Sequence, residues 1–117
     1  MSFGEYFKNL RKEKSKTQGE IAKAINKSTM LISGVESGKN GPFVQEDLVR
    51  ICEYLNLTDE EREKLFIEAS VERGNVPESI AAYMKEFRMA FRLINVLKRK
   101  NYTDEDISEL ISNLEEK

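Results

Sequence analysis

The sequence predicts an all-α fold, in which five short helices form an N-terminal domain and a two-helix extension follows it. Apolar residues recur at the three- and four-residue spacing of amphipathic helices along the chain. Threonine capping boxes mark two helix starts, at Thr17 with Glu20 and at Thr58 with Glu61. Helix-breaking residues near position 75 separate the extension from the five helices. Together these patterns favour a small helical bundle with an appended segment.

The first expected helix covers about residues 2 to 14. Its apolar residues repeat at i, i+3, i+4 and i+7: Phe3, Tyr6, Phe7 and Leu10. This spacing places them on one face of the helix, and that face needs partners from the rest of the chain.

Two short helices joined by a tight turn are expected next. The first begins at about Gln18, after the Thr17 cap, and ends at Asn26, because Asn enters the left-handed conformation at low cost. Ser28 is a good N-cap for the second helix, which ends at Gly38. The inward-facing residues of the pair are Ile21, Ala22, Ile25, Leu31, Ile32 and Val35. Helices this short are marginal alone, so neighbouring helices must supply the core.

A fourth helix is expected at about residues 44 to 56 and a fifth from Thr58 to about Val71. The apolar stripe of the fourth is Val44, Leu48, Ile51, Cys52 and Leu55, and that of the fifth is Leu65, Phe66 and Ala69. The chain's single cysteine lies on such a stripe, so we expect Cys52 to be a core residue without chemistry of its own.

This order of helices resembles the lambda repressor and Cro-like helix-turn-helix family, also called the xenobiotic-response-element type, over roughly residues 3 to 70. Gln18 matches the polar residue that opens the family's second helix, Ala22 its packing alanine and Asn26 its usual turn glycine. Glu36 and Gly38 resemble the Glu-x-Gly that closes its third helix. Further matching positions are Ile25, Ile32, Val35, Pro42, Leu48, Ile51, Leu55 and Leu57. The resemblance implies a lambda-repressor-like domain that binds double-stranded DNA through the outer face of its third helix.

The outer face of that helix lacks the Arg, Gln, Asn and Lys side chains that such proteins usually direct at base edges. The expected base-facing residues are Gln18, Ser28, Thr29, Met30, Ser33, Gly34 and Ser37. Ser and Thr bond to several bases, and Met30 suits a thymine methyl group. Gly34 costs about 1 kcal/mol against Ala inside a helix, so it marks either close backbone approach to DNA or a tolerated weak point. We therefore expect DNA binding that depends on Gln18, on backbone contacts and on DNA shape.

The charge of the chain is uneven. Its net charge is −2, yet residues 1–43 carry eight Lys or Arg against four acidic residues, which leaves −6 for the remainder. A basic N-terminal part suits attraction to DNA phosphates. The phosphate-contact candidates are Lys16, Lys27, Lys39 and Asn40. The alternative is a solvated lysine-rich surface, which is the preferred interpretation for Lys8, Lys12 and Lys14.

After the fifth helix the pattern changes. Residues 1–71 form the expected DNA-binding domain, residues 72–76 a linker marked by Gly74, and residues 77–117 a helical hairpin that opens with Pro77. The hairpin consists of one helix over about 78–100 and a second one capped by Thr103. Its expected interface residues are Tyr83, Phe87, Phe91, Ile94, Ile107, Leu110, Ile111 and Leu114.

The apolar surface of this hairpin is larger than proteins normally leave exposed. It can pack on the five-helix domain, on a second copy of the chain, or on another protein such as a toxin or a regulator. We favour a homodimer, because a two-fold pair would place two third helices about 34 Å apart on a palindromic site.

Several classes of protein are disfavoured. The chain has no histidine, no Gly-rich phosphate loop and no Cys/His metal set, so we expect neither an enzyme nor a metal or cofactor site. No stretch approaches the roughly 18 apolar residues of a membrane span, and the N-terminus shows no signal peptide or lipid anchor. The expectation is a cytoplasmic, sequence-specific transcriptional regulator, most simply a repressor. The alternative is an antitoxin-like or adaptor module that binds proteins and has a weakened DNA-reading face.

Overall fold

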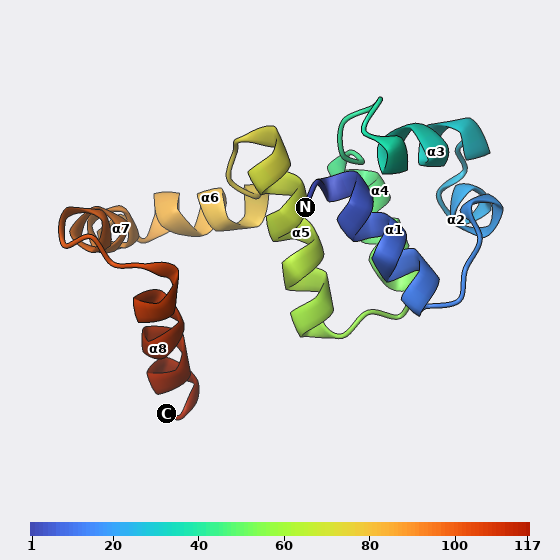
Figure 1. Cartoon of the computed structure of the whole chain (residues 1–117). Coiled ribbons are helices and arrows are strands. Elements are labelled where there is room, and N and C mark those ends of the chain that lie inside the picture. The colour runs from blue at the N-terminus through green and yellow to red at the C-terminus, as the bar shows by residue number, and fades with distance from the viewer. The chain divides into compact units, whose positions relative to one another are not determined.

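The computed structural model describes all 117 residues and contains eight helices and no strand (Figure 1). This confirms the all-α prediction. Contacts between residues divide the chain into two compact units, Met1–Pro77 and Glu78–Lys117. None of the eight helices combines the length and the apolar character needed to cross a bilayer.

The N-terminal unit holds five helices. They are α1 (Phe3–Glu13), α2 (Gln18–Ile25), α3 (Thr29–Ser37), α4 (Gln45–Tyr54) and α5 (Asp59–Arg73). Their ends lie close to the expected ones, because side-chain caps define several starts and left-handed residues define several exits. Asn26 has a φ of 56°, as expected for the exit from α2, and Ser15 and Asn56 play the same part after α1 and α4. In the turn after α2, the Lys27 N–H donates back to the Ala22 carbonyl at 2.9 Å.

One continuous core holds these five helices together. Its most deeply buried large side chains are Phe7, Ile21, Ile25, Ile32, Leu48, Ile51 and Leu65. Cys52 belongs to this core, as expected, and its burial raises the pKa of the thiol. Val44 does not belong to it. Val44 is the N-cap of α4 with extended backbone, so its side chain leaves the helical stripe and is 53% exposed.

Helices α1 and α3 cross at very short range. Gly4 is buried there, and a Cβ atom at this position would lie 2.6 Å from the Glu36 carbonyl oxygen and would also overlap the Val35 carbonyl. Ordinary contacts of a Cβ atom are longer than 3.4 Å. The crossing therefore requires glycine at this position of α1.

The last turn of α5 contacts two other parts of the N-terminal unit. A carboxylate oxygen of Glu72 accepts the Phe3 N–H at 2.8 Å, at the start of α1. The Arg73 guanidinium donates to the carbonyl oxygens of Pro42 and Phe43, in the loop between α3 and α4. Helix α5 therefore continues to Arg73, two residues beyond its expected end at about Val71, and Gly74 caps it.

The C-terminal unit contains three helices rather than the expected two. They are α6 (Glu78–Glu86), α7 (Met89–Arg99) and α8 (Asp104–Glu115). The single helix expected over residues 78–100 is interrupted at Phe87 and Arg88, whose carbonyls accept from Ala90 and Phe91 at 2.9 and 3.0 Å. These i+3 bonds tighten the chain where an i+4 helix would continue. The prediction of a two-helix hairpin was wrong on this point, whereas the Thr103 cap of the last helix is present.

No residue of the C-terminal unit is buried. Its best-covered side chains are only half-buried: Ala81, Met84, Ala90, Val96, Leu97 and Ile107. The unit thus lacks the kind of core that holds the first five helices together.

Candidate nucleic-acid interface

The candidate interface is built on α2, α3 and the turn between them. The Thr17 hydroxyl accepts the Glu20 N–H at 3.1 Å, while a Glu20 carboxylate oxygen accepts the Thr17 N–H at 2.9 Å. The Ser28 hydroxyl accepts the Leu31 N–H at 3.1 Å and so caps α3. These bonds define where both helices begin, and the left-handed Asn26 sets the turn between them.

One face of α3 is buried and the opposite face is open. Ile32 and Val35 lie in the core. The exposed residues include most of those expected to face bases: Ser28, Thr29, Met30, Ser33 and Ser37. Met30 is 82% exposed and is the one large apolar side chain of this face. The face is small, weakly polar and uncharged.

Gly34 departs from the expectation that it lies on this outer face. It is buried, because the loop after α3 folds back so that the Asn40 N–H donates to the Gly34 carbonyl at 2.9 Å. A Cβ atom at Gly34 would overlap the Asn40 side-chain amide. The glycine therefore makes room for Asn40, and the Asn40 side chain lies against α3.

A buried ion pair connects α1 to α3. Arg11 donates from Nε to Oε2 of Glu36 at 2.7 Å and from Nη2 to Oε1 at 3.0 Å, and the two side chains are 10% and 4% exposed. The Arg11 Nη1 also donates to the Lys16 carbonyl at 2.8 Å. Gln18, at the start of α2, donates from Nε2 to Oε1 of Glu36 at 3.0 Å. One carboxylate thus holds α1, α2 and α3 in a fixed arrangement.

The electrostatics of this network favour the charged pair. Burial alone raises the pKa of Glu36, but the hydrogen bonds from Arg11 and Gln18 and the Arg11 charge outweigh it, so the pKa lies below its usual value. The hydrogen bond with Glu36 in turn raises the pKa of Arg11, more than burial lowers it. Sequence reasoning counted Arg11 only as a basic residue. The available signal was its place four residues after Phe7, on the apolar stripe of α1.

The lysines expected to contact phosphates differ in the interactions that their ammonium groups make within the protein. Lys39 is exposed and forms no ion pair within the protein. The Lys16 ammonium lies 5.2 Å from the centre of the Tyr54 ring, a cation–π distance. Lys27 reaches to 4.0 Å from Oδ2 of Asp47, on the first turn of α4.

Asp47 is a buried carboxylate that sequence reasoning did not identify. Its side chain is 4% exposed, and its Oδ1 has no hydrogen-bond partner, although Arg50 lies 3.8 Å away. Because an unpaired buried charge is costly, the nearby Lys27 and Arg50 are needed to balance it. Lys27, just after the turn between α2 and α3, is thus placed where its charge offsets that of Asp47.

The residues expected at a dimer or partner interface lie in the C-terminal unit. Seven of them are exposed and Ile107 is half-buried. The rings of Tyr83 and Phe87 contact one another at a tilt of 46°, with ring centres 4.9 Å apart, and both side chains still face solvent. These side chains form a large accessible apolar surface.

Comparison with known families agrees with the geometry of α2 and α3. A family model described as a helix-turn-helix domain matches residues 2–65, which is more than half of the chain. The chain therefore belongs to the helix-turn-helix domain family, and a domain of this kind suggests a DNA-binding regulator. The resemblance to lambda repressor and Cro-like proteins is consistent with this membership. Searches of curated proteins and of solved structures gave no match.

Proposed function

We propose that this protein is a sequence-specific transcriptional repressor that binds double-stranded DNA in the cytoplasm as a homodimer on a palindromic operator. The observation that carries the proposal is the shape of α3, which is anchored in the core on one side and open along the other. The network around Glu36 holds this helix against α1 and α2, so its outer face is presented as a fixed surface. A fixed helix of this kind suits the major groove.

Base contacts in this proposal come from short side chains. Ser28, Thr29, Ser33 and Ser37 offer hydroxyls, and Met30 offers an apolar contact for thymine. Gln18 has its Nε2 engaged with Glu36, which leaves its carbonyl oxygen to accept from an adenine or cytosine amino group. None of these groups discriminates as strongly as arginine does at guanine, so DNA shape supplies part of the specificity.

Phosphate contacts in this proposal come first from Lys39, then from Lys16, just before α2, and from Lys27, in the turn between α2 and α3. Lys39 follows the C-terminal end of α3 directly and has no partner within the protein. The Asn40 side chain is packed against Gly34 and is therefore not free to bind a phosphate. Asn40 instead helps to fix the position of the loop.

The test measures DNA affinity as a function of salt. The purified protein first selects its preferred fragment from genomic DNA, and Lys39→Ala is then compared with the wild type on that fragment. Loss of one phosphate contact weakens binding severalfold and lowers the slope of log K against log salt by about 1. Lys12→Ala, which removes the same charge from an exposed site on α1, leaves the slope unchanged. Equal effects of the two variants would show that the assigned face is wrong.

A second candidate function is that of an antitoxin-like or adaptor module. The observation that favours it is the C-terminal unit, which exposes a large apolar surface and has no core of its own. If the wild type binds all genomic fragments equally and weakly at moderate salt, this function replaces the first. A stoichiometric complex with a protein partner would then be the expected state.

A further inference from the structure

The C-terminal unit pairs two helices of opposite charge. Helix α7 carries three basic residues and no acidic one, whereas α8 carries five acidic residues and no basic one. The two helices nevertheless make no ion pair, since all ion pairs of the structure lie in the N-terminal unit. Their complementary charges are therefore unused within one chain.

A shallow groove of about 500 Å³ lies along α7 and is open to solvent. Its lining residues are Met84, Phe91, Arg92, Ile94, Asn95 and Lys98. Phe91 and Ile94, which are 55% and 54% exposed, give the lining apolar surface, while Arg92 and Lys98 give it positive charge. The groove suits a helix with an apolar stripe and acidic flanks.

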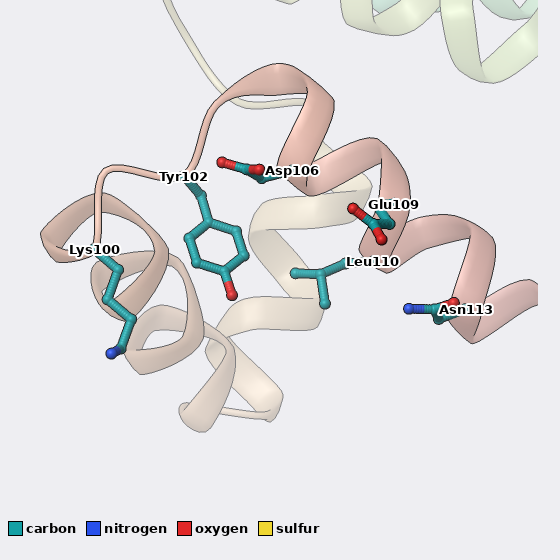
Figure 2. Close-up of a pocket in the computed structure, with 6 residues that line it drawn as sticks. All are labelled: Lys100, Tyr102, Asp106, Glu109, Leu110 and Asn113. Carbon is teal, nitrogen blue, oxygen red and sulfur yellow. The ribbon is translucent and has the colours of Figure 1, made fainter.

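Helix α8 has that character. Ile107, Leu110, Ile111 and Leu114 repeat at i, i+3, i+4 and i+7 on one face. On helical spacing, Asp104 and Glu115 lie on the same flank of this stripe. Figure 2 shows that Tyr102 and Leu110 point toward one another at the edge of a cavity of about 400 Å³. Ile107 is half-buried, whereas Ile111 and Leu114 are 48% and 66% exposed.

Within one chain, α8 does not lie along the groove. Only residues 100–103 join α7 to α8, and Asn101 turns there with a φ of 57°. In Figure 1, α7 is seen nearly end-on while α8 runs down the page, so the two helices do not pack side by side. Both the groove and the helix that fits it are thus left open by the same molecule.

We infer that α8 of one copy packs into the α6–α7 groove of a second copy, whose own α8 returns the same contact. This inference rests on the homodimer of the proposed function and specifies how it is built. Two-fold symmetry uses each groove and each α8 once, so the assembly closes at two copies. The occupant is a second copy because groove and helix match in apolar character and in charge. A stable interface needs about 800 Å² from each partner. The exposed apolar side chains of α6, α7 and α8 are the surface available to form it.

Charge reversal in the full-length chain tests this exchange. One variant carries Arg92→Glu and Lys98→Glu in the groove, and the other carries Asp104→Lys and Glu115→Lys on α8. Each variant alone places like charges at both contacts and weakens self-association by at least about tenfold in sedimentation equilibrium. Mixed in equal amounts, the two variants pair α8 and groove with opposite charge at both contacts. The dimer affinity then returns to within about threefold of the wild type.

This mixture separates exchange between copies from pairing within one chain. If α8 folded onto its own α7, each variant would keep like charges inside every molecule and mixing would restore nothing. That result, a monomeric wild type at about 100 µM, or single variants that dimerise like the wild type would each overturn the inference. A matched control with Lys12→Glu and Lys23→Glu, both exposed on the N-terminal unit, leaves dimerisation unchanged.

Two further readouts keep the outcomes distinct. Circular dichroism follows the helix content of each variant, and loss of helix that mixing does not recover also counts against the exchange. DNA binding is measured separately on the selected fragment. If the wild type dimerises by exchange of α8 but binds DNA without sequence preference, the proposed function is refuted and the inferred exchange is supported. If the wild type stays monomeric but binds DNA with sequence preference, the exchange is refuted and sequence-specific DNA binding is supported.

Discussion

Gly4 determines how closely α1 can approach α3. Because a Cβ atom there would overlap backbone carbonyls of Val35 and Glu36, Gly4→Ala must push the two helices apart. We expect a loss of about 1–3 kcal/mol in the free energy of unfolding, the usual cost of overpacking a core. Urea denaturation followed by circular dichroism measures it.

Gly19 is the matched control for Gly4. It lies exposed in α2, and the nearest atom to an added Cβ would be the Thr17 hydroxyl oxygen, at 3.8 Å. Gly19→Ala therefore leaves stability unchanged or raises it by up to about 1 kcal/mol. Similar losses in both variants would show that the crossing of α1 and α3 is not set by Gly4.

Glu36 makes the stability of the N-terminal unit depend on acid. Its pKa is lower in the folded protein than in the unfolded chain, so its contribution is complete above the unfolded pKa and is lost as pH falls through the folded one. Glu36→Gln removes this carboxylate but keeps its shape. In urea titrations from pH 7 down to about pH 3, the wild type loses stability more steeply than the variant below about pH 4.5. Parallel curves would contradict the buried ion pair.

The roles of several residues in the candidate site could be predicted from the sequence, whereas those of others could not. Ser28, Asn26 and Thr17 follow local rules for caps and turns, and the structure confirms those roles. The burial of Gly34 depends on a loop that folds back six residues later, and the position of Lys27 depends on Asp47, on another helix. Periodicity along one helix carries no information on such contacts between elements.

Helix α4 begins without a side-chain cap. Val44 occupies the N-cap position, is exposed and cannot accept a hydrogen bond from the first turn. Val44→Ser adds such an acceptor, and we expect it to raise the free energy of unfolding by about 0.5–1 kcal/mol. Val44→Ala, which removes the same apolar side chain without adding an acceptor, gives no such gain. Thermal unfolding of the two variants side by side measures the difference.

The helices of the N-terminal unit were predictable because caps, turns and stripes agree along each of them. The interruption between α6 and α7 was not. Tyr83, Phe87 and Phe91 continue one helical stripe across it, and neither Pro nor Gly marks the break. The chain tightens there through i+3 bonds from Ala90 and Phe91, which a repeating apolar pattern does not encode.

The two units of the molecule contribute unequally to its free energy of unfolding. All buried apolar residues belong to the N-terminal unit. A fragment of residues 1–77 therefore keeps the complete core, and we expect it to unfold cooperatively in urea, with a free energy within about 1 kcal/mol of that of the full chain. A fragment of residues 1–70 is the matched control, because it lacks Glu72 and Arg73 and their contacts with Phe3, Pro42 and Phe43. A gradual transition for the longer fragment would refute this division.

The anchoring of α5 by Arg73 has a consequence for operator architecture. Because the helix is held through Arg73 and the Asn75 N–H still donates to the Ser70 carbonyl, the tether to the C-terminal unit is only a few residues long. The four residues between Arg73 and Glu78 span at most about 14 Å when fully extended. In a dimer built through the C-terminal units, such a short linker limits the distance that each DNA-binding domain can move. An operator for this protein should then tolerate few inserted base pairs between its half-sites.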